Sequence, residues 1–249
     1  MSTFQETVSM RVNDDFVKFQ EILSNKLNIS MLKDYHIQSL KNLHKYLYIY
    51  KEILNELPLL EEAKSLAFDS FNGSMEFLIC LIQGKYKLAS MVIRGSMETY
   101  AKSLVLTTPV EPTTKFSNNI EISLKNMTEN ICNSESLNFR LCKELKKTVN
   151  STYADVIKKE YWELSDIVHS RTTTYNSCSE FLDDVLIIKF DESIFNLLLD
   201  KCNNIIKYFI EIIVLVNYKN LDSKMNYLAF EYITGNLSEN FKNIKNVYI

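Results

Sequence analysis

Apolar residues recur at steps of three and four along most of the chain, a spacing that places them on one face of an α-helix. Glycine and proline interrupt the pattern at only a few points, so the runs between them are long. The pattern predicts helices at about 16–23, 35–57, 59–82, 85–106, 120–127, 137–149, 157–169, 194–218 and 225–233, with a weak one after 235. A short β-like piece, VLIIKF at 185–190, is the exception.

Two of the predicted helices, 59–82 and 85–106, are separated by a very short connection. Gln83 and Gly84 allow a tight reversal there, so we expect an antiparallel helix hairpin at the centre of the core. Gly73 lies inside the first of these helices. Because the helical period resumes beyond it, we expect Gly73 to be a close-packing position rather than a break.

Composition supports an all-α fold. Hydrophobic residues make up 46% of the 249 positions, and four Gly and three Pro are too few turn residues for an all-β fold. We therefore predict a single all-α domain over residues 1–249, a helical bundle built on the long hairpin. Within it, residues 1–34 form an N-terminal arm with a short helix, 35–218 the helical core, and 219–249 a C-terminal helix and tail.

Charge, cysteine usage and the lack of a leader limit the functional classes. The net charge of −3 gives no overall basic field, so any nucleic-acid binding must come from a local patch or an assembled interface. The five cysteines contain no C-x-x-C pair, and we expect reduced, mostly buried thiols rather than a zinc site or disulfides. Without a basic leader or a run of eighteen apolar residues, we expect a cytoplasmic protein that contacts no membrane.

Two charged residues border the apolar face of the second hairpin helix. Arg94 precedes Glu98 by four positions, which is the less favourable order for a helical ion pair, so local helix stability explains the two residues poorly. A tertiary role is the better explanation. The pair either forms a salt bridge within the bundle or belongs to a functional site.

A small basic cluster lies in the predicted helix at 137–149. It consists of Arg140, Lys143, Lys146 and Lys147. Such a cluster is typical of a solvated helix face, and it is also able to approach a phosphate backbone. Both interpretations stay open.

The densest chemistry in the chain lies in YWELSDIVHSR, from Tyr161 to Arg171. These eleven residues hold the only tryptophan, one of three histidines and one of four arginines. In a helix, Ser165, Asp166 and His169 lie beside the apolar stripe that runs through Tyr161. The helix therefore carries a polar cluster along a buried edge.

Most common catalytic classes lack their motif here. The chain has no glycine-rich phosphate loop, no H-E-x-x-H zinc motif and no G-x-S-x-G elbow. His36 and His44 share a helix face without a third ligand nearby, so we predict neither a metal nor a cofactor. A histidine near neutral pKa with an arginine that holds phosphate is the minimum for metal-independent RNA cleavage, in which the 2′-hydroxyl is the nucleophile.

Two segments resemble a known group of proteins. The pattern G-K-Y-x-x-A-x-x-x-I-R-G-x-x-E at 84–98 and the pattern Y-W-x-L-S-x-x-V-H-S at 161–170 are similar to HEPN-related helical proteins of bacterial phage defence and toxin-antitoxin loci, abortive-infection proteins among them. The resemblance implies an all-α bundle that dimerises. Active members of that group cut RNA with an arginine and a histidine on one helix. The resemblance therefore implies a site with His169 as acid/base, Arg94 or Arg171 on the scissile phosphate, and Glu98 and Ser165 beside them.

The sequence departs from that pattern at one point, since no arginine precedes His169 by five to seven positions. Three hypotheses follow. The chain is a HEPN-like ribonuclease or toxin that acts as a dimer on RNA. Alternatively, it is a non-catalytic sensor or accessory subunit that binds a defence or antitoxin protein. The third hypothesis is a plain helical interaction protein whose resemblance to the group is accidental. In the architectural interpretation of the polar residues, Ser165 and His169 hydrogen-bond across the bundle and link the Arg94 and Glu98 pair to it.

Overall fold

Helices form all of the regular structure in the residues that the computed structural model describes, which are 2–27, 29, 32–108, 110–169 and 190–249, without the side chains of 2–7 and 169. The all-α prediction is thereby confirmed. In chain order the elements are α1 (Ser2–Lys26), α2 (Asp34–Glu56), α3 (Glu61–Ile82), α4 (Tyr86–Val105), α5 (Phe116–Ser134), α6 (Phe139–Val149), the π-helix η1 (Asn150–Ala154), α7 (Asp155–His169), α9 (Glu192–Val216), α10 (Tyr218–Lys224), α11 (Tyr227–Gly235) and α12 (Glu239–Tyr248).

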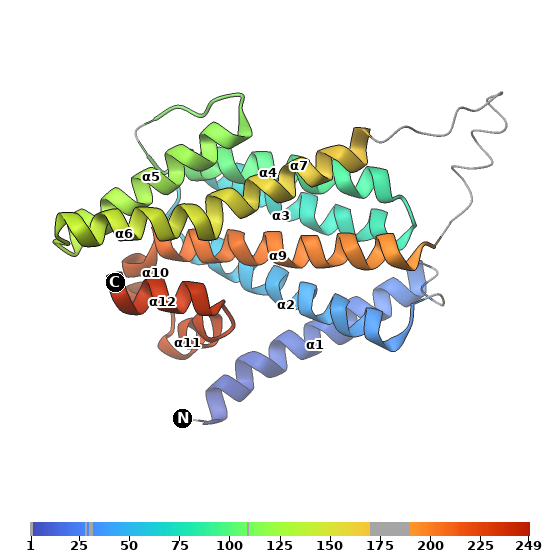
Figure 1. Ribbon diagram of the computed structural model, residues 1–249. Helices are drawn as coiled ribbons and strands as arrows, with labels where there is room; N and C mark the ends of the chain where they lie inside the picture. The colour runs from blue at the N-terminus through green and yellow to red at the C-terminus, as the bar shows by residue number, and fades with distance from the viewer. Residues whose placement is uncertain (1, 28, 30–31, 109, 170–189) are drawn as a thin grey trace.

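The predicted hairpin of α3 and α4 is present and forms the most extensive helix pair of the bundle. In Figure 1 the apolar helix α9 crosses the middle of the molecule, with α2 and α1 on one side and α5, α6 and α7 on the other. The starts of α4 and α9 and the end of α7 lie at the same end of the bundle (Figure 1). Consequently α7 runs antiparallel to α4, and the two helices pack against each other.

Small residues let α3 and α4 approach closely. A Cβ atom added at Gly73 would lie 3.2 Å from the Cβ of Ser96, which confirms Gly73 as a close-packing position. The Ser96 hydroxyl donates to the Ser70 carbonyl at 2.5 Å and lies 3.0 Å from the Ser74 hydroxyl. These buried hydroxyls satisfy one another, so the seam is held by hydrogen bonds as well as by packing.

An aromatic contact fixes the hairpin to α9. The rings of Tyr100 and Phe209 stack with 3.8 Å between their centres, and the Tyr100 hydroxyl donates to the Phe209 carbonyl at 2.6 Å. Both side chains are fully buried. The tyrosine therefore buries a large ring without leaving its hydroxyl unsatisfied.

The π-helix η1 joins α6 and α7 into one continuous helical rod. Apolar residues recur here at four-residue steps, from Leu145 and Val149 through Tyr153 to Ile157 and Tyr161, and all of them are buried. In an ideal α-helix each such step drifts by about 40°. The wider turn of the π-helix takes up this drift and keeps the apolar side on the core. A regular α-helical period does not run through this turn, so the sequence pattern predicted two separate helices.

The ends of several predicted helices were wrong. The N-terminal helix spans 25 residues rather than the short stretch predicted, because Val12, Phe16 and Leu23 all reach the core from one continuous helix. The helix predicted at 120–127 is also longer, as α5. The division into arm, core and tail stays a prediction. The β-like piece at 185–190 falls outside the described residues except for Phe190, which is in no strand.

The expectation of reduced cysteines was wrong for one pair. Cys132 and Cys142 form a disulfide, with their Cα atoms 5.7 Å apart. The turn between α5 and α6 brings these positions together, which the sequence spacing alone did not reveal. Cys202 is a free, buried thiol as expected, and Cys80 is free and partly exposed.

One described helix, α3, is long and apolar enough to cross a membrane by length and composition alone. In this fold it packs against α4 in the bundle, with Ser70, Ser74 and Phe77 fully buried. A core helix of a globular bundle meets the same criteria, so α3 is explained without a membrane.

The C-terminal helices are held to α9 by a buried carboxylate. Glu211 is fully buried, and its Oε1 accepts a hydrogen bond from the Ser238 backbone N–H at 2.7 Å, at the start of α12. The other carboxylate oxygen and the Tyr153 hydroxyl have no hydrogen-bond partner among the described residues. Burial raises the pKa of Glu211, although the bond from Ser238 lowers it in part.

We expect Glu211→Ala to lower the free energy of unfolding by about 2–3 kcal/mol, because the Ser238 N–H loses its acceptor in a buried site. Glu211→Gln keeps an acceptor and removes the buried charge, so it should stay within about 1 kcal/mol of wild type. Because the folded-state pKa is raised, the stabilisation from this group is present below its unfolded pKa, about 4.3, and is lost at higher pH. Urea unfolding at pH 4 and pH 7 checks this. The stability of Glu211→Gln should rise relative to that of wild type as pH rises. If Glu211→Ala were as stable as Glu211→Gln, Glu211 would not be a stabilising acceptor for the Ser238 N–H.

Candidate functional site

The structure brings together two of the residues selected from the sequence and adds a third. Arg94 Nη2 donates to the Tyr161 hydroxyl at 2.8 Å, and this hydroxyl donates to Glu98 Oε1 at 2.6 Å. Arg94 Nη2 also lies 3.5 Å from the same carboxylate oxygen. The three side chains form a closed polar tie between α4 and α7, which we call the Arg94 tie.

One aromatic ring packs against the guanidinium. Its carbon lies 4.6 Å from the centre of the Tyr161 ring, and Phe116 of α5 stacks on that ring with 4.3 Å between centres. Arg94 Nε is buried without a hydrogen-bond partner among the described residues. Burial raises the pKa of Tyr161, and its hydrogen bond to the Glu98 carboxylate raises it further, so the phenol stays neutral at pH 7.

Tyr161 is the member that the sequence analysis missed. It was assigned to the apolar stripe of α7, and its residue is indeed almost fully buried. Its hydroxyl reaches past the stripe to the two charges of α4. The available signal was the unfavourable order of Arg94 and Glu98, which indicated a tertiary partner without naming it.

The remaining flank residues of α7 do not join the tie. Ser165 is buried, but its hydroxyl donates to the Tyr161 carbonyl one turn earlier in the same helix, at 3.1 Å. Asp166 and Trp162 are exposed. The Ser165 hydroxyl is thus hydrogen-bonded within its own helix, and its place in a catalytic cluster stays a prediction.

His169 ends α7, and its side chain lies outside the described residues, as does all of Arg171. Their predicted roles therefore stay predictions. The position of His169 in the helix is known, however. It follows Tyr161 by eight residues, a rise of about 12 Å along α7. The Arg94 guanidinium is held at the Tyr161 end of that interval.

We expect Tyr161→Phe to lower the free energy of unfolding by about 1–2 kcal/mol, since it removes two hydrogen bonds to charged partners that keep partial access to water. Ser165→Ala, one turn away on the same helix, should cost less than about 1 kcal/mol. Thermal or urea unfolding by circular dichroism measures both. Equal stability of Tyr161→Phe and wild type would show that the tie adds nothing to the fold.

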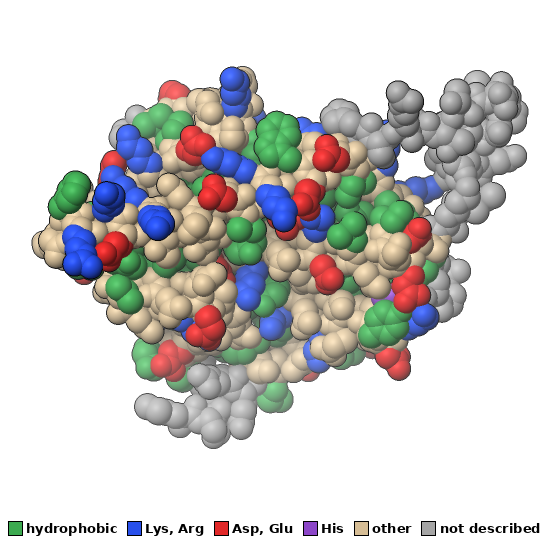
Figure 2. All heavy atoms as spheres, viewed as in Figure 1, with side chains coloured by type: hydrophobic (Ala, Val, Ile, Leu, Met, Phe, Trp, Pro, Cys, Tyr) green, Lys and Arg blue, Asp and Glu red, His purple; other side chains and the backbone are tan. Residues whose placement is uncertain are grey.

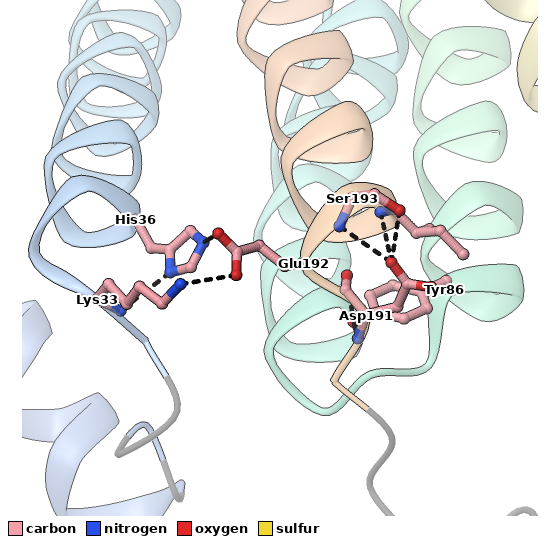
Figure 3. A network of polar contacts seen from close by, with 7 residues as sticks. Lys33, His36, Tyr86, Asp191, Glu192 and Ser193 are labelled. Carbon is pink, nitrogen blue, oxygen red and sulfur yellow. Dashed lines mark hydrogen bonds and ion pairs between the residues drawn. The ribbon is translucent and has the colours of Figure 1, made fainter.

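A second polar cluster lies at the end of the bundle, where α2, α4 and α9 begin (Figure 3). Lys33 Nζ pairs with Glu192 Oε2 at 2.9 Å, and the Tyr86 hydroxyl accepts from the Asp191 backbone N–H at 2.7 Å. Asp191 caps α9, accepting from the backbone N–H groups of the two residues after Glu192. These contacts fix the start of α9 against the starts of its two neighbours.

His36 lies in this cluster and is fully buried. Its Nδ1 accepts the Lys33 backbone N–H at 3.0 Å, so the proton of the neutral ring is on Nε2, which lies 3.9 Å from Glu192 Oε1. Burial lowers the pKa of His36, and the Lys33 charge lowers it further. An imidazole with no exposed atom does not touch a substrate, so we assign His36 to the capping of α2.

His44, the other histidine of α2, is buried and lies 2.8 Å from Asp15 Oδ2 of α1. Burial lowers its pKa, while the Asp15 carboxylate acts in the opposite direction. It therefore ties α1 to α2. Over the described part of the chain, no group of three or more His, Cys, Asp or Glu side chains is arranged to hold a metal ion.

The chain matches no protein-family model, no curated protein and no solved structure. Fold and site together define an all-α bundle in which Arg94 and Glu98 of α4 meet Tyr161 of α7.

Proposed function

We propose that this is a HEPN-like protein of bacterial antiviral defence, of the abortive-infection kind, that acts as a non-catalytic subunit and binds a partner protein in the cytoplasm. The two segments that carry the sequence resemblance support the relationship. One lies at the start of α4 and the other forms the second half of α7, and these helices pack against each other through Arg94 and Tyr161.

The Arg94 tie is the observation that favours binding over catalysis. A guanidinium that stabilises a scissile phosphate must offer free donors to it. Here Arg94 Nη2 already donates to Tyr161 and lies beside Glu98, Nε is buried, and one side of the guanidinium is covered by the Tyr161 ring. The arginine that the resemblance assigns to phosphate therefore has a structural partner.

Partner identity follows from the same proposal. The protein forms a homodimer or a complex with a defence or antitoxin protein encoded beside it. The proposal includes no metal or cofactor.

Phage plating tests the function. Cells that carry this gene with its neighbouring genes are expected to resist phage, and cells that carry it alone are not. His169→Ala should leave the plating efficiency within about twofold of wild type, and a tagged chain should co-purify with one neighbouring product. Protection by the isolated gene that His169→Ala abolishes would contradict a non-catalytic role.

Ribonuclease activity is the second candidate, and one observation favours it. Arg94 faces α7, the helix that ends at His169, and among the described residues only Glu98 and Tyr161 bond to its guanidinium. A change that frees the guanidinium would allow it to bind phosphate. Loss of RNA integrity on expression, prevented by both Arg94→Ala and His169→Ala at unchanged protein level, would establish this alternative.

A further inference from the structure

Helix α6 concentrates positive charge on a protein whose net charge is −3. Its eleven residues hold four cations and one carboxylate, Glu144, a local balance of +3. Arg140, Lys143 and Lys147 follow one another at three- and four-residue steps and are all exposed, so they share one face of the helix. Figure 2 shows Lys and Arg side chains gathered over the region of α5 and α6.

The stability of α6 does not account for these charges. Arg140 is the second residue of the helix, at the positive end of its dipole, where a cation is unfavourable. Lys143 and Lys147 repel each other four residues apart. Neither lysine has an ion pair in the described part of the chain, and Arg140 pairs only with Glu144 of its own helix.

A hollow of about 530 Å³ adjoins this face, between α5, α6, η1 and α7. Lys125, Lys146 and Lys158 line it. Lys158 pairs with Glu121, and Lys146 lies 3.5 Å from Glu129, whereas Lys125 has no ion pair among the described residues. Asn150 and Thr128 add neutral hydrogen-bonding groups to the lining, and Glu121 and Asp155 add two carboxylates. The cations of α6 thus continue into a concave polar surface.

An exposed aromatic ring lies at the start of the same helix. Phe139 is 85% exposed and directly precedes Arg140, and the Asn138 side chain caps α6 by accepting from the Leu141 backbone N–H. A ring open to solvent next to cations is the arrangement that binds unpaired bases, since the ring stacks on a base and the cations contact phosphates. A duplex offers no free base face to such a ring.

We propose that α6 and the adjoining hollow form a binding surface for single-stranded nucleic acid, in which Arg140, Lys143 and Lys147 contact consecutive phosphates and Phe139 stacks on a base. This surface is separate from the Arg94 tie, and the proposal does not rest on the proposed function. It gives the protein a nucleic-acid contact whether or not it cuts RNA.

Fluorescence anisotropy of a labelled single-stranded 20-mer, prepared as RNA and as DNA, tests the surface at several salt concentrations. For wild type, the logarithm of affinity should fall with the logarithm of salt with a slope near −2 from three phosphate contacts. The triple variant R140Q/K143Q/K147Q should bind at least tenfold more weakly at low salt and lose most of that slope. The matched control K18Q/K51Q/K87Q removes three exposed lysines from α1, α2 and α4, and it should stay within twofold of wild type.

Phe139→Ala separates stacking from charge. It should weaken binding by about tenfold with the salt slope unchanged, because stacking releases no counterions. Tighter binding of RNA than of DNA would add contacts to the 2′-hydroxyl, and equal binding would assign the surface to phosphate and base alone. Three outcomes overturn the proposal: no binding at low salt, equal loss in both triple variants, and displacement of RNA by poly-glutamate as readily as by unlabelled RNA.

Discussion

Replacing Ser96 by leucine is expected to lower the free energy of unfolding by about 4 kcal/mol, from overpacking and from loss of hydrogen bonds. The Ser96 side chain faces Gly73, where even one added Cβ atom would lie 3.2 Å away, so the seam has no room for three more carbons. The substitution also removes the hydroxyl that bonds to the Ser70 hydroxyl at 3.1 Å and to the Ser74 hydroxyl at 3.0 Å, although Ser74 still donates to the Ser70 carbonyl. Overpacking costs about 1–3 kcal/mol and each unsatisfied buried group a similar amount.

Guanidinium chloride unfolding, followed by helical circular dichroism, measures this loss. Ser96→Ala is the matched control, since it removes the same hydroxyl without adding volume, and we expect it to lose about 1–2 kcal/mol. If leucine and alanine at this position were equally stable, the close packing of α3 on α4 would not hold in solution.

Lys201→Met is expected to cost about 3–4 kcal/mol at pH 7, because it removes one partner from a nearly buried ion pair. Lys201 of α9 is 8% exposed and bonds to Glu160 Oε2 at 2.6 Å and also to Glu163, both on α7. Burial alone would lower the pKa of Lys201, but the two carboxylates raise it overall, so the lysine is charged. Without it, two carboxylates are left facing an apolar side chain.

The loss of stability in Lys201→Met should be smaller at low pH. The hydrogen bond from Lys201 lowers the pKa of Glu163, so the stabilisation is present above the unfolded pKa of about 4.3 and is lost as pH falls through the folded value. Urea unfolding at pH 7 and pH 4 should therefore show a smaller difference between variant and wild type at pH 4. The triple variant K201M/E160Q/E163Q should recover at least half of the loss at pH 7. A loss that is independent of pH, with no recovery, would mean that Lys201 acts through packing alone.

Most of the fold was predictable because long amphipathic periods leave little choice. The hairpin of α3 and α4 follows from two long apolar runs around Gln83 and Gly84, and the cap of α9 follows from Asp191. The π-helix was not predicted, although four-residue steps from Leu145 to Tyr161 carry its signal. A run of four-residue apolar steps indicates a π-helical turn only when the two flanking helices are known to be continuous.

The candidate site was predictable in part. The order of Arg94 and Glu98 indicated a tertiary partner, but the partner comes from a helix more than sixty residues later in the chain, and Tyr161 had a sufficient explanation as a core residue. Ser165 bonds to the preceding turn of its own helix, as a buried serine often does, and its role in the site stays a prediction. Cys132 and Cys142 meet because of the turn between α5 and α6, and the amino-acid composition does not specify the geometry of that turn.

The Arg94 tie is the central feature of the proposed function, because it gives Arg94 a structural partner in place of a phosphate. If the Arg94 tie is architectural, Arg94→Ala lowers the stability of the fold, and wild type and variant both lack nuclease activity. If it masks a catalytic arginine, the same residue is needed for cleavage.

The most direct measurement is cleavage of single-stranded RNA by the purified full-length chain in the presence of EDTA, compared with His169→Ala and Arg94→Ala. We expect intact RNA in all three samples over hours, together with a lower unfolding midpoint for Arg94→Ala alone. Cleavage by wild type that both substitutions abolish, in variants shown to be folded at the assay temperature, would contradict the non-catalytic role and identify the protein as a ribonuclease.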